Sequence, residues 1–379
     1  MGNILDYVDW RGDIMMDKSE FNPIDGLILS QLAYVDFDGI VRRGFGTPVK
    51  LSKAAKRYGK IFDRLETETL SRLAVNSYTV FMKIAEADRF KDLTLFNYAQ
   101  RYNKEDSEQF GAVTIQIDSD TYVVAFRGTD DTLAGWEEDF KLCYMTPVGA
   151  QIEAERYLRK VCRRVDGKIY ICGHSKGGNL AVYSSMMMSE EDKKKIVRIM
   201  NYDGPGFLQD IIERPEYRSV LPKIESYMPQ GSIVGMIMYH EGEYNIVHST
   251  EKGMQQHVSL SWEVIGNRFV RDVGFDKSSI IFGAACKKWV SEISVGEREQ
   301  FIQIVFQILK SGEADTITGF TSKMLTSMNY VIKSYSGLDK TTRRMVRSII
   351  KQMIKLGTQT ISENKKENKA LFKNITDTE

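Results

Sequence analysis

The amino-acid sequence predicts an α/β fold with a mainly parallel central sheet flanked by helices. Three short apolar runs rich in β-branched and aromatic residues, 121–126, 169–172 and 196–202, alternate with segments of helical periodicity. This alternation implies right-handed crossovers, which make the strands parallel and place helices on both faces of the sheet. A glycine-rich turn joins the second run to the next helix, at the kind of junction where α/β proteins hold reactive groups.

The other elements follow from local patterns. A helical stripe of apolar residues within 25–40 ends in a turn rich in Asp and Gly. The helices between the three strands are expected at 136–143, 152–165 and 179–188, and further strands are expected at 224–228, 233–239 and 244–249.

The chain is long enough for more than one unit. With 379 residues it exceeds the roughly 250–300 residues at which a single hydrophobic core stops growing. From about residue 266 the pattern becomes helical, and apolar residues recur at helical spacing within 301–309. We therefore predict an α/β domain at 1–265 and a helical C-terminal region at 266–379.

Composition argues against several classes of function. Lys and Arg total 52 while Asp and Glu total 51, so no net charge draws the chain to nucleic acid. The N-terminus lacks a basic segment followed by an apolar run, and no stretch of about 18 apolar residues occurs, so we expect an unexported, cytoplasmic protein. The four cysteines lack metal-ligand spacing and suit buried thiols, and we expect neither a metal nor another cofactor.

One serine lies among glycines where a predicted strand gives way to a helix. Gly173-His174-Ser175-Lys176-Gly177 has the form G-x-S-x-G of a nucleophile elbow. In so sharp a turn, side chains two residues before and after the serine would collide with neighbouring elements, and glycine removes the collision. The hydroxyl would then face a crevice at a helix N-terminus, whose free N–H groups favour developing negative charge. We predict that Ser175 is the nucleophile; the alternative is a tight turn in which Ser175 only caps the helix.

A second motif would complete an oxyanion hole. The predicted strand at 121–126 runs into Arg127-Gly128-Thr129, and Trp136 and Asp139 follow in the next turn and helix. Acyl transfer needs two preorganised N–H donors aimed at the tetrahedral oxyanion. We predict that the backbone N–H groups of Thr129 and Lys176 are these donors, with the Thr129 hydroxyl as a further candidate.

The two motifs, in this order, resemble the class 3 lipase group of α/β-hydrolases. More closely, the chain resembles the bacterial Mbeg1-like family of unknown function. That resemblance spans about residues 1–265 and is carried by DYVDWRGD, NPIDGLILSQLAY, AFRGTDD, GHSKGGNLA, NYDGPGF, SIVGM and QQHVSLSW. It implies an α/β-hydrolase fold with Thr129 at the oxyanion hole. Lys176 departs from the class 3 pattern, which usually has an apolar residue there, so its side chain would either make the mouth of the site polar or point to solvent.

The general base is expected among three histidines. His174 lies too close to Ser175 to turn back on it, which leaves His240, His248 and His257. His257 follows the last predicted strand by a loop and precedes an apolar helix start, where this fold delivers its histidine. We predict His257 as the base, with His240 and His248 as alternatives.

The triad acid is harder to place. Class 3 lipases carry an aspartate on the loop after the next strand, and in this chain Ser232 stands in that region without a carboxylate. Asp203 lies at the carboxyl end of the preceding strand and preserves the chain order Ser, Asp, His. We predict Asp203 as the acid. The alternatives are Glu241, Glu243 and a weaker dyad in which a serine or a backbone carbonyl orients the histidine.

Together these residues predict a serine hydrolase that cleaves small-molecule or lipid carboxylic esters through an acyl-enzyme. A peptidase, an amidase or an acyltransferase could use the same groups, because triad geometry does not set the leaving group. A catalytically inactive hydrolase fold that binds a ligand is the third hypothesis. The basic amphipathic segment 339–357 predicts either peripheral contact with anionic membranes or packing on the parent domain or a partner subunit.

Overall fold

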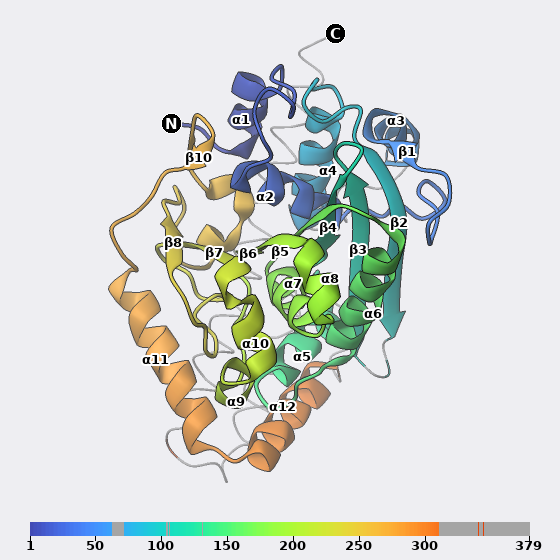
Figure 1. Cartoon of the computed structure of the whole chain (residues 1–379). Helices are drawn as coiled ribbons and strands as arrows, with labels where there is room; N and C mark the ends of the chain where they lie inside the picture. The colour runs from blue at the N-terminus through green and yellow to red at the C-terminus, as the bar shows by residue number, and fades with distance from the viewer. Residues whose placement is uncertain are drawn as a thin grey trace.

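An eight-stranded sheet forms the centre of the computed structural model, which describes residues 1–62, 72–103, 105, 107–130, 132–310, 340 and 344. The strands follow one another across the sheet in chain order (Figure 1). They are β1 Val49–Lys50, β2 Thr94–Asn103, β3 Glu108–Gln116, β4 Thr121–Phe126, β5 Lys168–His174, β6 Ile196–Tyr202, β7 Ile224–Pro229 and β8 Tyr244–Val247. Strands β1 to β4 pair antiparallel, whereas β4 to β8 pair parallel.

The parallel strands are buried on both faces, which explains their continuous apolar sequences. Along β4, Val123 and Ala125 join one hydrophobic cluster, while Val124 and Phe126 join the cluster on the opposite face. The predicted strands at 121–126, 169–172, 196–202, 224–228 and 244–249 are confirmed, with shifts of a few residues at their ends.

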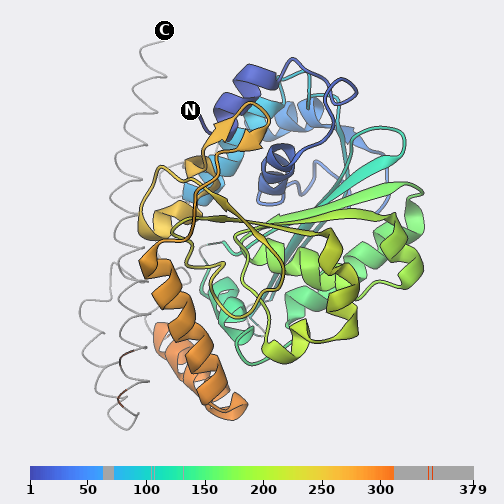
Figure 2. The ribbon, with the colours of Figure 1, turned by 60° about the vertical axis from the view of Figure 1, so that its left-hand side comes forward.

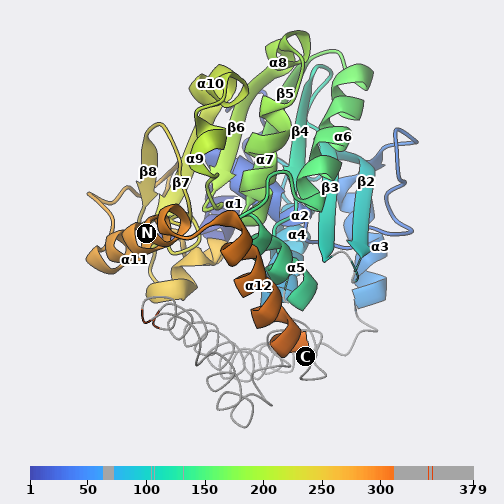
Figure 3. The ribbon, with the colours of Figure 1, turned by 90° about the horizontal axis from the view of Figure 1, so that it is seen from below.

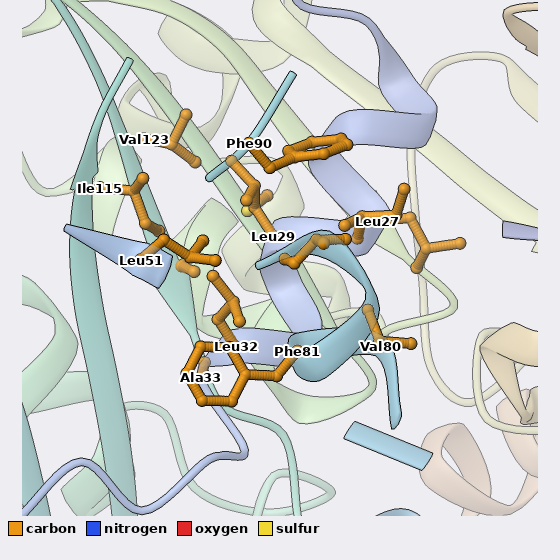
Figure 4. Close-up of a cluster of buried hydrophobic side chains, with 14 of the residues drawn as sticks. Leu27, Leu29, Leu32, Ala33, Leu51, Val80, Phe81, Phe90, Ile115 and Val123 are labelled. Carbon is orange, nitrogen blue, oxygen red and sulfur yellow. The ribbon is translucent and has the colours of Figure 1, made fainter. Parts of the chain in front are cut away.

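Helices cover both faces of the sheet, and Figure 2 shows the N-terminal helices on one side and the helices coloured green on the other. The first side holds α1 Ile4–Arg11, α2 Pro23–Leu32, α3 Leu51–Phe62 and α4 Arg72–Ile84. The second side holds α6 Gly149–Arg164, α7 Lys176–Met186, α8 Glu190–Lys195, α9 Gln209–Ile212 and α10 Pro215–Val220. Figure 4 shows how Leu27, Leu29 and Leu32 of α2 meet side chains of the sheet and of α4. This architecture is the predicted α/β-hydrolase fold.

Two helices of the C-terminal region pack on the α/β part of the chain. They are α11 Lys277–Glu292 and α12 Val295–Lys310, and Figure 3 shows α12 beside α5 Leu133–Lys141. Trp289, Phe301 and Phe306 share a hydrophobic cluster with Leu133 and Leu142 from the α5 region. The hairpin formed by β9 Val264–Ile265 and β10 Arg268–Phe269 spans the predicted boundary at 265/266, and that boundary stays a prediction.

The predicted strand at 233–239 is wrong. The segment forms turns in which Met236 N–H bonds to the Ile233 carbonyl and Ile237 N–H to the Val234 carbonyl, and only an isolated bridge joins Tyr239 to Phe207. Its β-forming residues have no neighbouring strand to pair with, because β8 occupies the position beside β7. Propensity alone could not reveal this, since strand formation depends on a partner.

The predictions for the helices, the antiparallel strands and the C-terminal segment differ in their outcomes. The helices expected at 136–143, 152–165 and 179–188 are confirmed as α5, α6 and α7. The antiparallel strands β2 and β3 were not predicted. The amphipathic segment 339–357 lies outside the described residues, apart from Lys340 and Arg344. No helix in the described part of the chain is long and apolar enough to cross a membrane.

Candidate active site

Ser175 lies at a strained turn between β5 and α7. Its backbone has φ 59° and ψ −135°, a conformation that residues other than glycine rarely adopt. A Cβ atom on Gly173 would lie 2.1 Å from the carbonyl oxygen of Gly177, and one on Gly177 would lie 2.2 Å from that of Phe126. Both glycines are therefore required by close backbone approach, as predicted. The Ser175 side chain makes no capping hydrogen bond to α7, which argues against the helix-cap alternative.

Asp203 and His257 are hydrogen-bonded to each other. Asp203 directly follows β6 with φ 52° and is fully buried, and His257 ends the 3₁₀ helix η3 Gly253–His257. The distance from Asp203 Oδ2 to His257 Nδ1 is 2.6 Å. Asp203 Oδ1 accepts from the Ser232 hydroxyl at 2.5 Å and from the Gly235 N–H at 3.2 Å. Both carboxylate oxygens are thus occupied, and the imidazole ring is held through Nδ1.

The other candidate bases and acids make no hydrogen bond to Asp203 or His257 in the described part of the chain, although His240 lies close enough to Asp203 for the carboxylate to affect its pKa. His248 is 42% exposed and pairs with Asp272 at 2.9 Å. Glu241 pairs with Arg218 at 2.5 Å, and Glu243 is exposed. His240 is half-buried, and burial lowers its pKa to about 4. Of the candidates, only Asp203 and His257 are hydrogen-bonded to each other in the described part of the chain.

His174 contacts His257 through its ring and through one hydrogen bond. The two rings lie 4.5 Å apart at an interplanar angle of 32°. His174 Nε2 is 2.8 Å from the carbonyl oxygen of His257, which can only accept, so Nε2 carries the proton. The Tyr34 hydroxyl lies 3.2 Å from His174 Nδ1 and donates to the His174 carbonyl oxygen at 3.1 Å. Burial lowers the pKa of His174 to about 3, so this ring stays neutral near pH 7.

The Arg-Gly-Thr loop packs directly against the elbow. A Cβ atom on Gly128 would lie 2.2 Å from the Tyr34 hydroxyl and 3.0 Å from Ser175 Cβ. The Thr129 hydroxyl donates to Asp139 Oδ2 at 2.5 Å, which fixes the Thr129 side chain beside the serine turn. Burial raises the pKa of Asp139 to about 6, while the nearby Lys176 and the Thr129 hydroxyl oppose this rise. The loop predicted to line the oxyanion hole is therefore next to Ser175.

The Lys176 side chain reaches neither the mouth of the site nor solvent, so both expectations for it were wrong. It is fully buried and its Nζ lies 2.7 Å from Glu138 Oε2, 3.0 Å from the Gln109 carbonyl oxygen and 3.7 Å from Asp139 Oδ1. Glu138 also accepts from the backbone N–H groups of Gln109 and Ala150, at 3.1 and 2.7 Å. The physical reason is that α5 brings a carboxylate beneath the start of α7, and a buried ammonium group requires such a partner.

Sequence reasoning missed Tyr34 and Glu138. A signal for Glu138 existed, because a lysine at a position that is usually apolar, at the start of an otherwise apolar helix, implies a buried acidic partner. No such signal marked Tyr34, which comes from the turn after α2. Among the described residues, no group of three or more His, Cys, Asp and Glu side chains could hold a metal ion.

These elements place the chain among proteins of the α/β-hydrolase fold. The sequence model of the Mbeg1-like family matches residues 84–307, more than half of the chain, and the chain therefore belongs to the Mbeg1-like family. This match continues through α11 and most of α12. No curated protein matches the chain. Among solved structures, the crystal structure of M37 lipase is similar, with 14% sequence identity and a TM-score of 0.34 over 57% of this chain and 70% of that one.

Proposed function

We propose that the protein is a serine hydrolase that cleaves carboxylic esters, including lipid esters, by acyl transfer. The observation that carries this proposal is the hydrogen bond of 2.6 Å between the buried Asp203 and the partly exposed His257, at the same edge of the sheet as the strained Ser175. The three residues follow β5, β6 and the segment after β8, so the parallel strands deliver them to one edge.

In the proposed mechanism, His257 acts as general base toward the Ser175 hydroxyl. Asp203 holds the Nδ1–H tautomer, which leaves Nε2 free to take the proton as Ser175 Oγ attacks the ester carbonyl. The imidazolium that forms is stabilised by the buried carboxylate. It then protonates the leaving alcohol, and a water molecule activated by the same ring hydrolyses the acyl-enzyme.

The oxyanion of each tetrahedral intermediate would bind the N–H groups of Thr129 and Lys176. Lys176 is the first residue of α7, so its N–H is one of the unpaired donors at the helix N-terminus. The Thr129 hydroxyl is held by Asp139 at 2.5 Å, which leaves its backbone N–H as the donor that needs no rearrangement. Donors fixed in advance in this way stabilise developing charge most effectively.

Backbone strain favours an enzyme over an inactive binding protein. Ser175 has φ 59° and ψ −135°, and such a conformation persists only where the surrounding structure enforces it. Asp203 is also a fully buried carboxylate that faces an imidazole, an arrangement with a cost in desolvation and an evident use in catalysis. The leaving group is not set by this geometry, and an ester is proposed because it is the least demanding acyl donor.

Labelling with a fluorophosphonate probe tests the nucleophile, and p-nitrophenyl esters from acetate to palmitate test turnover. We expect both signals in the wild type and neither in Ser175→Ala. Ser184→Ala is the matched control, since Ser184 lies buried on the same helix and its hydroxyl donates to the Ala181 carbonyl oxygen within that helix. A folded wild type that neither labels nor turns over any ester would contradict the proposal.

A further inference from the structure

The loop after β7 contacts the buried carboxylate of Asp203. Ser232 is buried, and its hydroxyl donates to Asp203 Oδ1 at 2.5 Å. Gly235 adds a backbone N–H at 3.2 Å, and a Cβ atom there would lie 2.5 Å from the same oxygen, so only glycine allows this approach. Strands β6 and β7 are neighbours and parallel, which brings the ends of both strands to one place.

Helix α11 holds this loop from outside the sheet. The buried Ser279 hydroxyl donates to the Ser232 carbonyl oxygen, and the Asp276 N–H donates to the Gln230 carbonyl oxygen at 2.7 Å. Gly283, one to two turns further along, packs against Met236 of the loop. Figure 1 shows α11 along the edge of the molecule beside β7 and β8. Contacts therefore continue from α11 through Ser232 to Asp203.

We infer that Ser232 is a positioning residue for the triad acid and that α11 fixes Ser232 through Ser279. The inference rests on the proposed function, because it assigns Asp203 the role of acid. A carboxylate on a single bond can rotate unless both oxygens are fixed. The two donors on Oδ1 set its plane so that Oδ2 faces His257 Nδ1.

Removing the Ser232 hydroxyl leaves Asp203 Oδ1 with the Gly235 N–H as its remaining donor among the described residues. A hydrogen bond to a charged group is strong, so its loss disturbs the Asp203–His257 pair more than the rest of the fold. Within the described part of the chain, Ser232 makes no hydrogen bond to Ser175 or to the predicted oxyanion donors. Substrate binding should therefore change little, while the chemical step slows.

The experiment compares Ser232→Ala and Ser279→Ala with the wild type in two measurements. Steady-state kinetics on the p-nitrophenyl ester that the wild type prefers separate kcat from KM. Proton NMR follows the downfield resonance of the His257 Nδ1–H, which reports the hydrogen bond to Asp203 without any need for turnover. Ser291→Ala is the control, because Ser291 is exposed on the same helix and its hydroxyl bonds to the Lys288 carbonyl oxygen.

We expect Ser232→Ala to lower kcat about tenfold to a hundredfold with KM nearly unchanged, and to move or broaden the downfield resonance. Ser279→Ala should change both readouts in the same direction by a smaller amount, and Ser291→Ala should change neither. If Ser232→Ala keeps the wild-type kcat and resonance while Ser175→Ala is inactive, the inference is wrong and the proposed function stands. If Ser232→Ala does not fold, an unchanged kcat and resonance in Ser279→Ala refute the role of α11. If the wild type has no activity, the resonance alone decides whether Ser232 orients the Asp203–His257 pair.

Discussion

The buried ion pair beneath the serine turn is expected to contribute strongly to stability. Glu138→Gln keeps the size of the side chain and an acceptor oxygen for the backbone, but it removes the charge 2.7 Å from Lys176 Nζ. Both side chains are almost fully buried, so solvent cannot replace the lost partner. Breaking one side of such a pair typically costs about 3–5 kcal/mol. Asp139 lies 3.7 Å from the ammonium and should limit the loss to about 3 kcal/mol.

A double-mutant cycle separates the ion pair from other effects of the substitutions. Lys176→Met should also cost about 3 kcal/mol, because it leaves a buried carboxylate with only backbone donors. Lys176→Met combined with Glu138→Gln removes both charges and should cost less than the sum by at least ~2 kcal/mol. Calorimetry would record the change as a fall in Tm of several degrees for each single variant. Single variants that each cost under about 1 kcal/mol and that add in the double variant would refute the buried pair.

Three further predictions follow from the same geometry. Asp203→Asn keeps the size of the side chain, and Asn also tolerates positive φ, but the charge that faces His257 is lost. If His257 is the proposed general base, kcat should fall about 10³–10⁴-fold with little change in Tm. Gly177→Ala places a Cβ atom 2.2 Å from the carbonyl oxygen at the end of β4, and calorimetry should show a loss of roughly 3 kcal/mol. Burial lowers the pKa of His174 to about 3. Between that value and about pH 6.5, His174 binds a proton in the unfolded chain but not in the native state. Its contribution to the free energy of unfolding is therefore fully present above pH 6.5 and is lost as the pH decreases. Urea unfolding should show that the loss of stability from pH 7 to pH 5 is about 2 kcal/mol smaller in His174→Asn than in the wild type.

Each of these three predictions has a control variant or a result that would contradict it. Asp272→Asn removes the surface carboxylate beside His248 and should leave kcat unchanged; equal kcat losses in the two aspartate variants would count against a triad. Gly274→Ala meets no atom within 4 Å and should be neutral, so a Gly177→Ala variant of equal stability would show that the elbow is looser than described. Parallel pH dependences for the wild type and His174→Asn would show that His174 can take a proton in the native state.

Much of the fold was predictable because parallel strands buried on two faces have continuous apolar sequences. The runs at 121–126 and 196–202 coincide with β4 and β6. The strand β3, with the sequence EQFGAVTIQ, was missed because it contains Gly, Ala and Gln among its apolar residues. The segment 233–239 failed for the opposite reason, since strong β-formers lie where no partner strand is available.

The sequence by itself determined the elements whose requirements are local. Close backbone approach at the turn requires glycine on both sides of Ser175, so this motif could be recognised without any knowledge of the rest of the fold. Chain order and the positions of the strand ends also favoured Asp203 and His257 as candidate site residues. In the structure Asp203 Oδ2 lies 2.6 Å from His257 Nδ1. Their roles in catalysis stay predictions.

Only the tertiary structure decided which distant side chains complete the site. Glu138 comes from α5 and contacts Lys176, Tyr34 comes from the turn after α2 and contacts His174, and Ser279 comes from α11 and contacts Ser232. Each of these contacts joins segments that are far apart in the chain. A buried charge or polar group must find a partner, but the sequence does not say which element will supply it. Packing on the sheet made that choice for Lys176, for His174 and for Ser232.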